Sequence, residues 1–174
     1  SDGAGACVVE ENEIENKGIL SFASQSYTFE EAYFLFYGSS YNPEKPAETN
    51  YIKMHGRKIY EFALNNVPLA MQLALEKSNV DISEVKKILI HQANEKMDEA
   101  IINRFYKLFD KDMPDGIMPM SIHKLGNSSV ATVPTLYDLI LNNKLKNHEL
   151  KSGDVIILAS VGAGMNINAI VYKQ

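Results

Sequence analysis

The pattern of hydrophobic and polar positions predicts strands and helices that alternate along much of the chain. Apolar runs at residues 88–90 and 155–160 predict buried strands. Apolar residues at three- and four-residue spacing predict amphipathic helices over residues 56–74 and 94–108. Further segments predict a helix over 130–142 and short strands at 6–10, 18–23, 117–122 and 166–172. This alternation is typical of a layered α/β fold with helices packed on a mixed sheet.

Local signals refine these boundaries. Pro68 is expected to kink the first helix or to split it. Asp81 followed by Glu84 predicts a capping box, and Asn94 is suited to cap the next helix. Residues 29–51 show no clear period and are rich in aromatic side chains, so this excursion is expected to be functional or to cover another surface.

Composition and charge exclude several classes of protein. The 174 residues, 45% of them hydrophobic, are enough for one substantial core, and the net charge of −5 argues against nucleic-acid binding. No apolar run has the roughly 20 residues needed to cross a bilayer. The single cysteine, Cys7, fits a reducing cytosol, so the expected location is cytoplasmic. The glycine-rich turn at residues 1–5 predicts that a preceding part of the protein is missing, because such turns connect two elements.

Two common kinds of site are not expected. The four histidines, at positions 55, 91, 123 and 148, do not show the spacing of a helical zinc site, so no metal is predicted. A dinucleotide loop at Gly162 and Gly164 would need a third glycine where Ile167 stands, and the turn leads into a strand rather than a helix.

Polar residues at the ends of predicted strands are the remaining candidates for chemistry. His91 and Asn94 follow the strand at 88–90, and Asn127 follows the predicted strand at 117–122. The Gly162–Gly164 turn follows the strand at 155–160. Because open α/β sheets place their sites at the carboxyl ends of strands, these loops are expected to converge on one spot.

Three segments together resemble the second half of the β-ketoacyl-acyl-carrier-protein synthase III family. They are His91-Gln92-Ala93-Asn94, Gly126-Asn127-Ser128-Ser129 and Gly162-Ala163-Gly164. The opening Asp2-Gly3-Ala4-Gly5-Ala6 resembles the turn with which that half begins. The resemblance implies a thiolase-like fold, with residues 1–174 forming a C-terminal domain that contains a mixed five-stranded sheet with helices on its faces, and with the N-terminal half absent.

The resemblance also implies an activity. Members of this family are acyltransferases that carry out a decarboxylative Claisen condensation in fatty-acid or related biosynthesis. A cysteine of the first half is acylated by an acyl-CoA, and the carbanion formed from malonyl-acyl carrier protein attacks that thioester. His91 and Asn127 match the catalytic histidine and asparagine, which would offer neutral N–H donors to the enolate oxygen. The substrates are CoA and carrier-protein thioesters, and no further cofactor is implied.

Other positions take roles by the same resemblance. Gly56, Tyr60, Ala93 and Asn94 match residues that line the pantetheine tunnel. The backbone of Gly162, Ala163 and Gly164 matches an oxyanion-hole loop, and Lys96 and Arg104 match basic positions that meet the acyl carrier protein. The full-length protein is expected to be a homodimer, and this chain is expected to be inactive alone. Leu125 departs from the family pattern, in which many members have histidine, and residues 29–51 form a longer segment than expected.

Alternative interpretations remain open on the sequence. One is a secondary-metabolite synthase with the same histidine and asparagine, and another is a non-catalytic thiolase-fold partner subunit or scaffold. A hydroxymethylglutaryl-CoA synthase-like enzyme is less favoured, because no matching acid residue is found. Taken singly, His91 could be a core histidine and Asn127 a turn residue. Cys7 is expected to be a small buried residue, and His123, Lys124 and His148 are expected at the surface.

Overall fold

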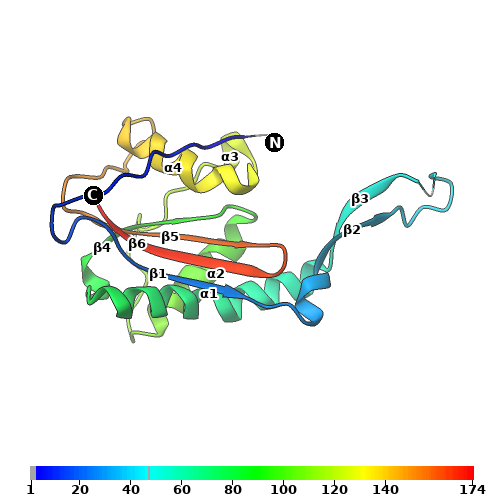
Figure 1. Ribbon diagram of the computed structural model, residues 1–174, viewed down its shortest axis with the longest axis horizontal. Coiled ribbons are helices and arrows are strands. Elements are labelled where there is room, and N and C mark those ends of the chain that lie inside the picture. The colour runs from blue at the N-terminus through cyan, green and yellow to red at the C-terminus, as the bar shows by residue number, and fades with distance from the viewer. Residues whose placement is uncertain (1–2, 47) are drawn as a thin grey trace.

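A mixed four-stranded sheet forms the centre of the computed structural model, which describes residues 3–46 and 48–174 (Figure 1). The strands lie in the order β1-β6-β5-β4. Their bounds are β1 Gly18–Ser26, β4 Val85–Ile90, β5 Val155–Gly162 and β6 Asn166–Lys173. β4 and β5 are parallel, whereas β5–β6 and β6–β1 are antiparallel. Asp2, part of the opening turn, lies outside the described residues.

Helices cover both faces of this sheet. Figure 1 shows α1 (Gly56–Ser78) and α2 (Glu95–Lys107) below the sheet and α4 (Thr132–Leu141) above it. The larger part of the core lies between α1, α2 and the sheet, and a smaller cluster joins Leu136 and Ile140 of α4 to Leu89 and Ile156. The shorter elements are η1 Glu30–Tyr33, η2 Ile82–Glu84, α3 Ile122–Leu125 and η3 Ser129–Ala131. The predicted α/β class with a mixed sheet is therefore confirmed.

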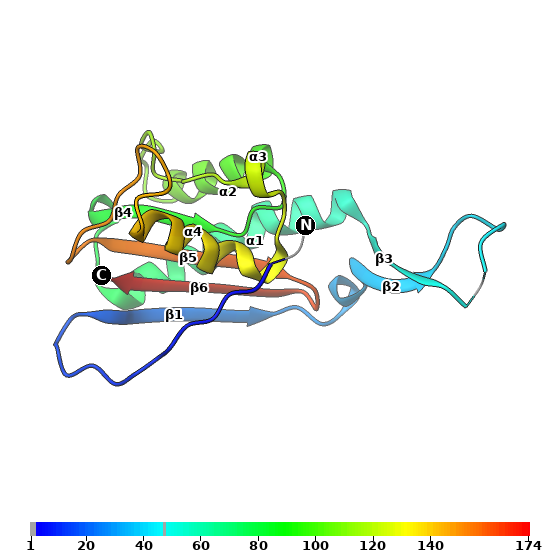
Figure 2. The ribbon, with the colours of Figure 1, turned by 90° about the horizontal axis from the view of Figure 1, so that it is seen from above.

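A two-stranded hairpin extends away from the body of the molecule (Figures 1 and 2). Its strands are β2 (Leu35–Ser39) and β3 (Asn50–Met54), and they pair antiparallel. Tyr37 pairs with Ile52 on one face of the ribbon, and both side chains are exposed. The hairpin accounts for the aromatic segment at residues 29–51, in which the sequence showed no period.

The prediction of a fifth strand is wrong for the described residues, and segment 117–122 shows why. It contacts β4 through one backbone bond, in which Ile88 N donates to Ile117 O at 2.9 Å. Pro119 has no N–H to give to a ladder, and Gly116 just before it has a positive φ of 67°. The segment therefore runs irregularly beside β4 and turns into α3 instead of forming a strand.

The predicted strand at residues 6–10 does not form either. Gly3 lies against Ser128 and Ala131, and Gly5 lies against Pro134, so the chain enters over the α4 side of the sheet (Figure 1). Residues 6–10 consequently find no strand to pair with and stay exposed. Cys7 lies in this coil, and the expectation that it is buried is wrong.

Pro68 does not split the first helix. Helix α1 continues for 23 residues through Pro68, although a proline cannot donate to the carbonyl four residues earlier. That carbonyl belongs to Leu64, and Arg104 of α2 donates to it from Nη1 at 3.2 Å. The same nitrogen donates to Asn65 Oδ1 at 2.8 Å. Arg104 therefore replaces the hydrogen bond that the proline removes.

Asp98 is a buried carboxyl group in the first turns of α2. The residue is 0% exposed, and neither carboxylate oxygen has a hydrogen-bond partner within the described part of the chain. Burial raises its pKa to about 8, an effect that the backbone of Asn94 partly offsets and the charge of Glu95 increases. Asp98 is therefore expected to be protonated at neutral pH.

Candidate active site

His91 lies directly after β4, at the carboxyl end of two parallel strands. Its backbone N–H continues the ladder by donating to Ala159 O of β5 at 3.0 Å. Its ring Nδ1 lies 3.1 Å from the carbonyl oxygen of Ser129. Because a carbonyl oxygen can only accept, Nδ1 must carry the proton in this bond. Burial lowers the pKa of His91 and the bond to Ser129 partly opposes this, so the ring is neutral at neutral pH and Nε2 holds a lone pair.

Asn127 lies in the loop between α3 and η3 and is bonded to the same residue. Its Oδ1 accepts a hydrogen bond from Ser129 N at 2.8 Å, which closes a local turn of the kind asparagine favours. Ser129 has a positive φ of 53°, and Gly126 just before the asparagine has one of 67°. His91 and Asn127, far apart in sequence, thus converge on the carbonyl and the N–H of Ser129.

This arrangement changes one part of the expected chemistry. The sequence suggested that a neutral imidazole would offer its N–H to a substrate oxygen. The structure assigns the Nδ1 proton of His91 to Ser129, so a neutral ring presents Nε2 as an acceptor. Nε2 donates only when the ring is protonated. Asn127 uses Oδ1 as the acceptor, so the donor end of its side chain is Nδ2.

The sequence reasoning missed the importance of Ser129 and Gln92. Gln92 is 0% exposed and bonds to the segment that leads into α3. The strand before it is apolar and buried at Ile88, Leu89 and Ile90 alike, so no alternation in the sequence signalled that Gln92 would be buried. No signal marks Ser129 either, because it acts through its backbone.

The residues predicted to line a pantetheine tunnel lie on two helix starts. Gly56 is the first residue of α1, and Tyr60, one turn further, is 42% exposed. In Figures 1 and 2 the start of α1 lies at the same end of the molecule as the β5–β6 turn. Ala93 is exposed, and Asn94 caps α2 by accepting from Met97 N at 3.2 Å. A role in substrate binding stays a prediction for all four.

The Gly162–Gly164 segment ends β5 and turns into β6, as predicted. Asn166 Nδ2 donates to Ala163 O at 2.7 Å across this turn. Gly164 has a φ of 124°, a backbone conformation that other residues rarely adopt, so the position favours glycine. Because β4 and β5 are parallel, this turn emerges at the sheet edge where His91 lies. Its oxyanion-hole role stays a prediction.

The two residues predicted to contact a carrier protein differ in their surroundings. Lys96 is exposed in the first turn of α2. Arg104 is bonded to α1 and lines a shallow depression of about 330 Å³ between the two helices, together with Leu64 and Leu108. Arg104 thus has a structural role that the sequence did not reveal, and the carrier-protein contact stays a prediction for both residues.

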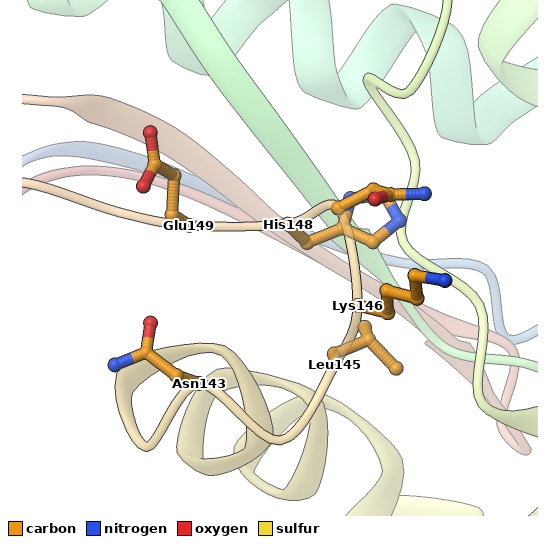
Figure 3. A pocket seen from close by; sticks show the side chains of 6 residues that line it. Asn143, Leu145, Lys146, His148 and Glu149 are labelled. Carbon is orange, nitrogen blue, oxygen red and sulfur yellow. The ribbon is translucent and has the colours of Figure 1, made fainter.

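A second depression, of about 360 Å³, lies on the connection between α4 and β5 and is lined by Asn143 and by residues 145–149. Figure 3 shows Lys146 and His148 directed to one side and Glu149 to the other. His148 was expected at the surface, but it is half-buried, and its Nδ1 has no hydrogen-bond partner among the described residues. Burial, and then the charge of Lys87, lower its pKa. This depression contains none of the predicted site residues.

Within residues 3–46 and 48–174, no group of three or more His, Cys, Asp or Glu side chains is arranged to hold a metal ion. Across the same residues, each helix is too short or too polar to span a bilayer.

Comparison with known proteins identifies a family and related sequences. Residues 75–174 match the family model described as 3-oxoacyl-[acyl-carrier-protein (ACP)] synthase III C terminal. The chain is 32% identical over 122 residues to the beta-ketoacyl-[acyl-carrier-protein] synthase III of Trichodesmium erythraeum, a match that covers 70% of this chain and 34% of the relative. It is 28% identical over 177 residues to the synthase of the same name from Lactobacillus helveticus, covering 99% of this chain and 51% of that one.

A solved structure supports the same relationship. The crystal structure of 3-oxoacyl-[acyl-carrier-protein] synthase III from Aquifex aeolicus superimposes with a TM-score of 0.70 at 26% identity, over 93% of this chain and 46% of that one. The fold is that of a domain of the thiolase-like class. The chain belongs to the 3-oxoacyl-[acyl-carrier-protein] synthase III family, in its C-terminal region. It spans about half the length of the Lactobacillus helveticus and Aquifex aeolicus proteins.

Proposed function

We propose that this chain supplies the histidine and asparagine of a synthase III active site, which condenses an acyl-CoA with malonyl-acyl carrier protein with loss of carbon dioxide. The observation that carries the proposal is the convergence of His91 and Asn127 on Ser129 at the carboxyl ends of β4 and β5. A sheet edge of this kind is where α/β folds place their ligands. Membership of a synthase family supports the assignment.

The two side chains are proposed to act on the thioester oxygen of the malonyl group. Loss of carbon dioxide leaves negative charge on that oxygen, and donors held in place beforehand stabilise it. Asn127 would donate from Nδ2. His91 would donate from Nε2 once the ring is protonated, because Nδ1 already donates to Ser129. An anionic substrate beside the ring would raise the pKa of His91 and so favour that cation.

The remaining parts of the reaction are assigned to other groups. The acyl group would be carried by a cysteine of an N-terminal half, because Cys7 lies in the exposed coil before β1. This chain alone is therefore proposed not to condense substrates. Pantetheine would be contacted by Gly56, Tyr60, Ala93 and Asn94. The carrier protein would be contacted by Lys96 and Arg104. The complete enzyme is proposed to be a cytoplasmic homodimer.

The test is carbon dioxide release from labelled malonyl-acyl carrier protein by the full-length protein. His91→Ala and Asn127→Ala are each expected to slow release by about 10²–10³-fold, the usual effect of losing one such donor. The matched control is Asn103→Ala, on the exposed side of α2, which should release carbon dioxide at the wild-type rate. Equal release by wild type and His91→Ala would overturn the proposed role. A wild-type protein that releases none would favour the non-catalytic partner subunit.

A further inference from the structure

Gln92, the residue after His91, is buried, and its side chain makes four hydrogen bonds. It is 0% exposed. Its Nε2 donates to Pro119 O at 2.8 Å. Its Oε1 accepts from Ser121 N at 2.9 Å, from Ser121 Oγ at 3.3 Å and from Ile122 N at 3.0 Å. All of these partners lie in the irregular segment beside β4, which continues through α3 to Asn127.

The carboxamide of Gln92 acts as the cap of α3. The first N–H groups of a helix have no partner within the helix and usually bond to the side chain of the N-cap residue. Ser121 is the N-cap of α3, yet its side chain makes no such bond. Gln92 Oε1 accepts from Ser121 N and Ile122 N in its place. Because α3 has only four residues, Gln92 fixes the position from which the Asn127 loop departs.

Two adjacent residues thus hold the two ends of one segment. Gln92 binds its start, at Pro119 to Ile122, and His91 binds its end, at Ser129. Hydrogen bonds within the segment transmit the constraint, because Leu125 N donates to Ser121 O at 3.0 Å and Gly126 N to Ile122 O at 2.9 Å. Asn127 follows immediately.

We propose that Gln92 is a positioning residue, which sets the orientation of His91 and Asn127 through its bonds to the Pro119–Ile122 segment. The proposal rests on the function proposed above for the relevance of these two side chains to catalysis. It predicts that loss of the Gln92 bonds moves Ser129 and therefore weakens the bond from Ser129 O to His91 Nδ1. A side chain that only stabilised the fold would leave that bond unchanged in folded molecules.

Two substitutions of Gln92 are expected to differ in effect. Gln92→Met has a similar shape but removes all four bonds, and it leaves the buried polar groups of Pro119, Ser121 and Ile122 without their partner. Gln92→Glu is the conservative variant: it keeps the three bonds that Oε1 accepts, and in the protonated form that burial favours, its second oxygen can donate to Pro119 O. Ser21→Ala is the matched control, because it removes one buried hydrogen bond, from Ser21 Oγ to Ala74 O, far from α3.

The experiment is ¹⁵N NMR of the His91 ring in the wild-type chain and in the three variants, at a temperature where each is folded. In the wild type, Nδ1 should carry the proton, with a ring pKa below the ordinary value. Gln92→Met should shift the tautomer and the pKa toward those of a solvated histidine, whereas Gln92→Glu and Ser21→Ala should leave both unchanged. A folded Gln92→Met protein with unchanged His91 signals would overturn the proposal.

A kinetic arm in the full-length protein separates the two proposals. Gln92→Met should lower kcat for carbon dioxide release by about a hundredfold with little change in KM, as expected when catalytic groups are displaced by about 1 Å. A wild-type kcat in Gln92→Met would count against positioning. If His91→Ala has no effect on release while Gln92→Met still shifts the His91 signals, the proposed function fails and the positioning role stands.

Discussion

Replacing the buried carboxyl of Asp98 by a carboxamide tests the packing around α2. Asp98→Asn keeps the shape of the side chain and removes its ionisation. In the folded protein burial raises the pKa of Asp98 to about 8 from an ordinary value of 3.8. Between these values the folded state holds a proton that the unfolded state has released. Wild-type stability should therefore fall as the pH rises from about 4 to about 8, and change little from this cause outside that range.

The magnitude follows from the size of this shift. Each unit of difference in pKa corresponds to about 1.4 kcal/mol. At pH 7, roughly three units above the ordinary pKa, the cost in unfolding free energy is about 4 kcal/mol. Typical domains are stable by only about 5–15 kcal/mol, so a penalty of this size is easily measured.

The assay is urea unfolding of wild type and Asp98→Asn at pH 4.5, 6.0 and 7.5. The unfolding free energy of the variant should exceed that of the wild type by an amount that grows with pH and reaches several kcal/mol at pH 7.5. Asp112→Asn is the control, because Asp112 is exposed and its bond to Lys107 lowers its pKa. The stability that ionised Asp112 contributes is lost only as the pH falls below about 4. Asp112→Asn should therefore leave unchanged the slope of unfolding free energy against pH between 4.5 and 7.5. A difference between wild type and Asp98→Asn that is the same at all three pH values would refute the reasoning.

Two further substitutions test contacts that place the helices. Arg104→Met should cost about 1–2 kcal/mol of unfolding free energy, because Leu64 O loses its donor. Pro68→Ala restores a helical N–H to that carbonyl, so in this background Arg104→Met should cost clearly less unfolding free energy. An equal cost in both backgrounds, measured as a double-mutant cycle, would contradict the claim that Arg104 replaces the missing hydrogen bond. Gly5→Ala should cost about 1–3 kcal/mol, because the new Cβ would lie 2.4 Å from Pro134 Cγ. Thermal unfolding measures the cost of Gly5→Ala, and Gly56→Ala, where the added Cβ has open space, is the control. Equal losses of stability in the two variants would contradict the steric explanation.

Local patterns were sufficient for much of the fold. The apolar run before His91 predicted β4, and the cap at Asn94 predicted the start of α2, because these signals depend only on neighbouring residues. The failures arose from distant contacts. Segment 117–122 has the composition of a strand, but Pro119 and the side chain of Gln92 hold it in another conformation. The coil at 6–10 follows a segment in which Gly5 lies against Pro134 of α4, a contact that its own sequence does not signal.

The candidate site was predictable in outline only. The rule that ligands bind at strand ends placed His91 and the Gly162–Gly164 turn at one edge, and the parallel pairing of β4 and β5 agrees with it. Which nitrogen of His91 carries the proton could not be predicted, because it depends on the carbonyl of Ser129. Ser129 has a positive φ, a conformation that its sequence does not signal.

The most direct test of the central claim is a double-mutant cycle of His91→Ala and Asn127→Ala, read as carbon dioxide release from malonyl-acyl carrier protein by the full-length protein. If both side chains act on one thioester oxygen, the double variant should be little slower than the slower single variant, because groups that act as a unit are not additive. Rate losses that multiply in the double variant, or single variants as fast as wild type, would contradict the account.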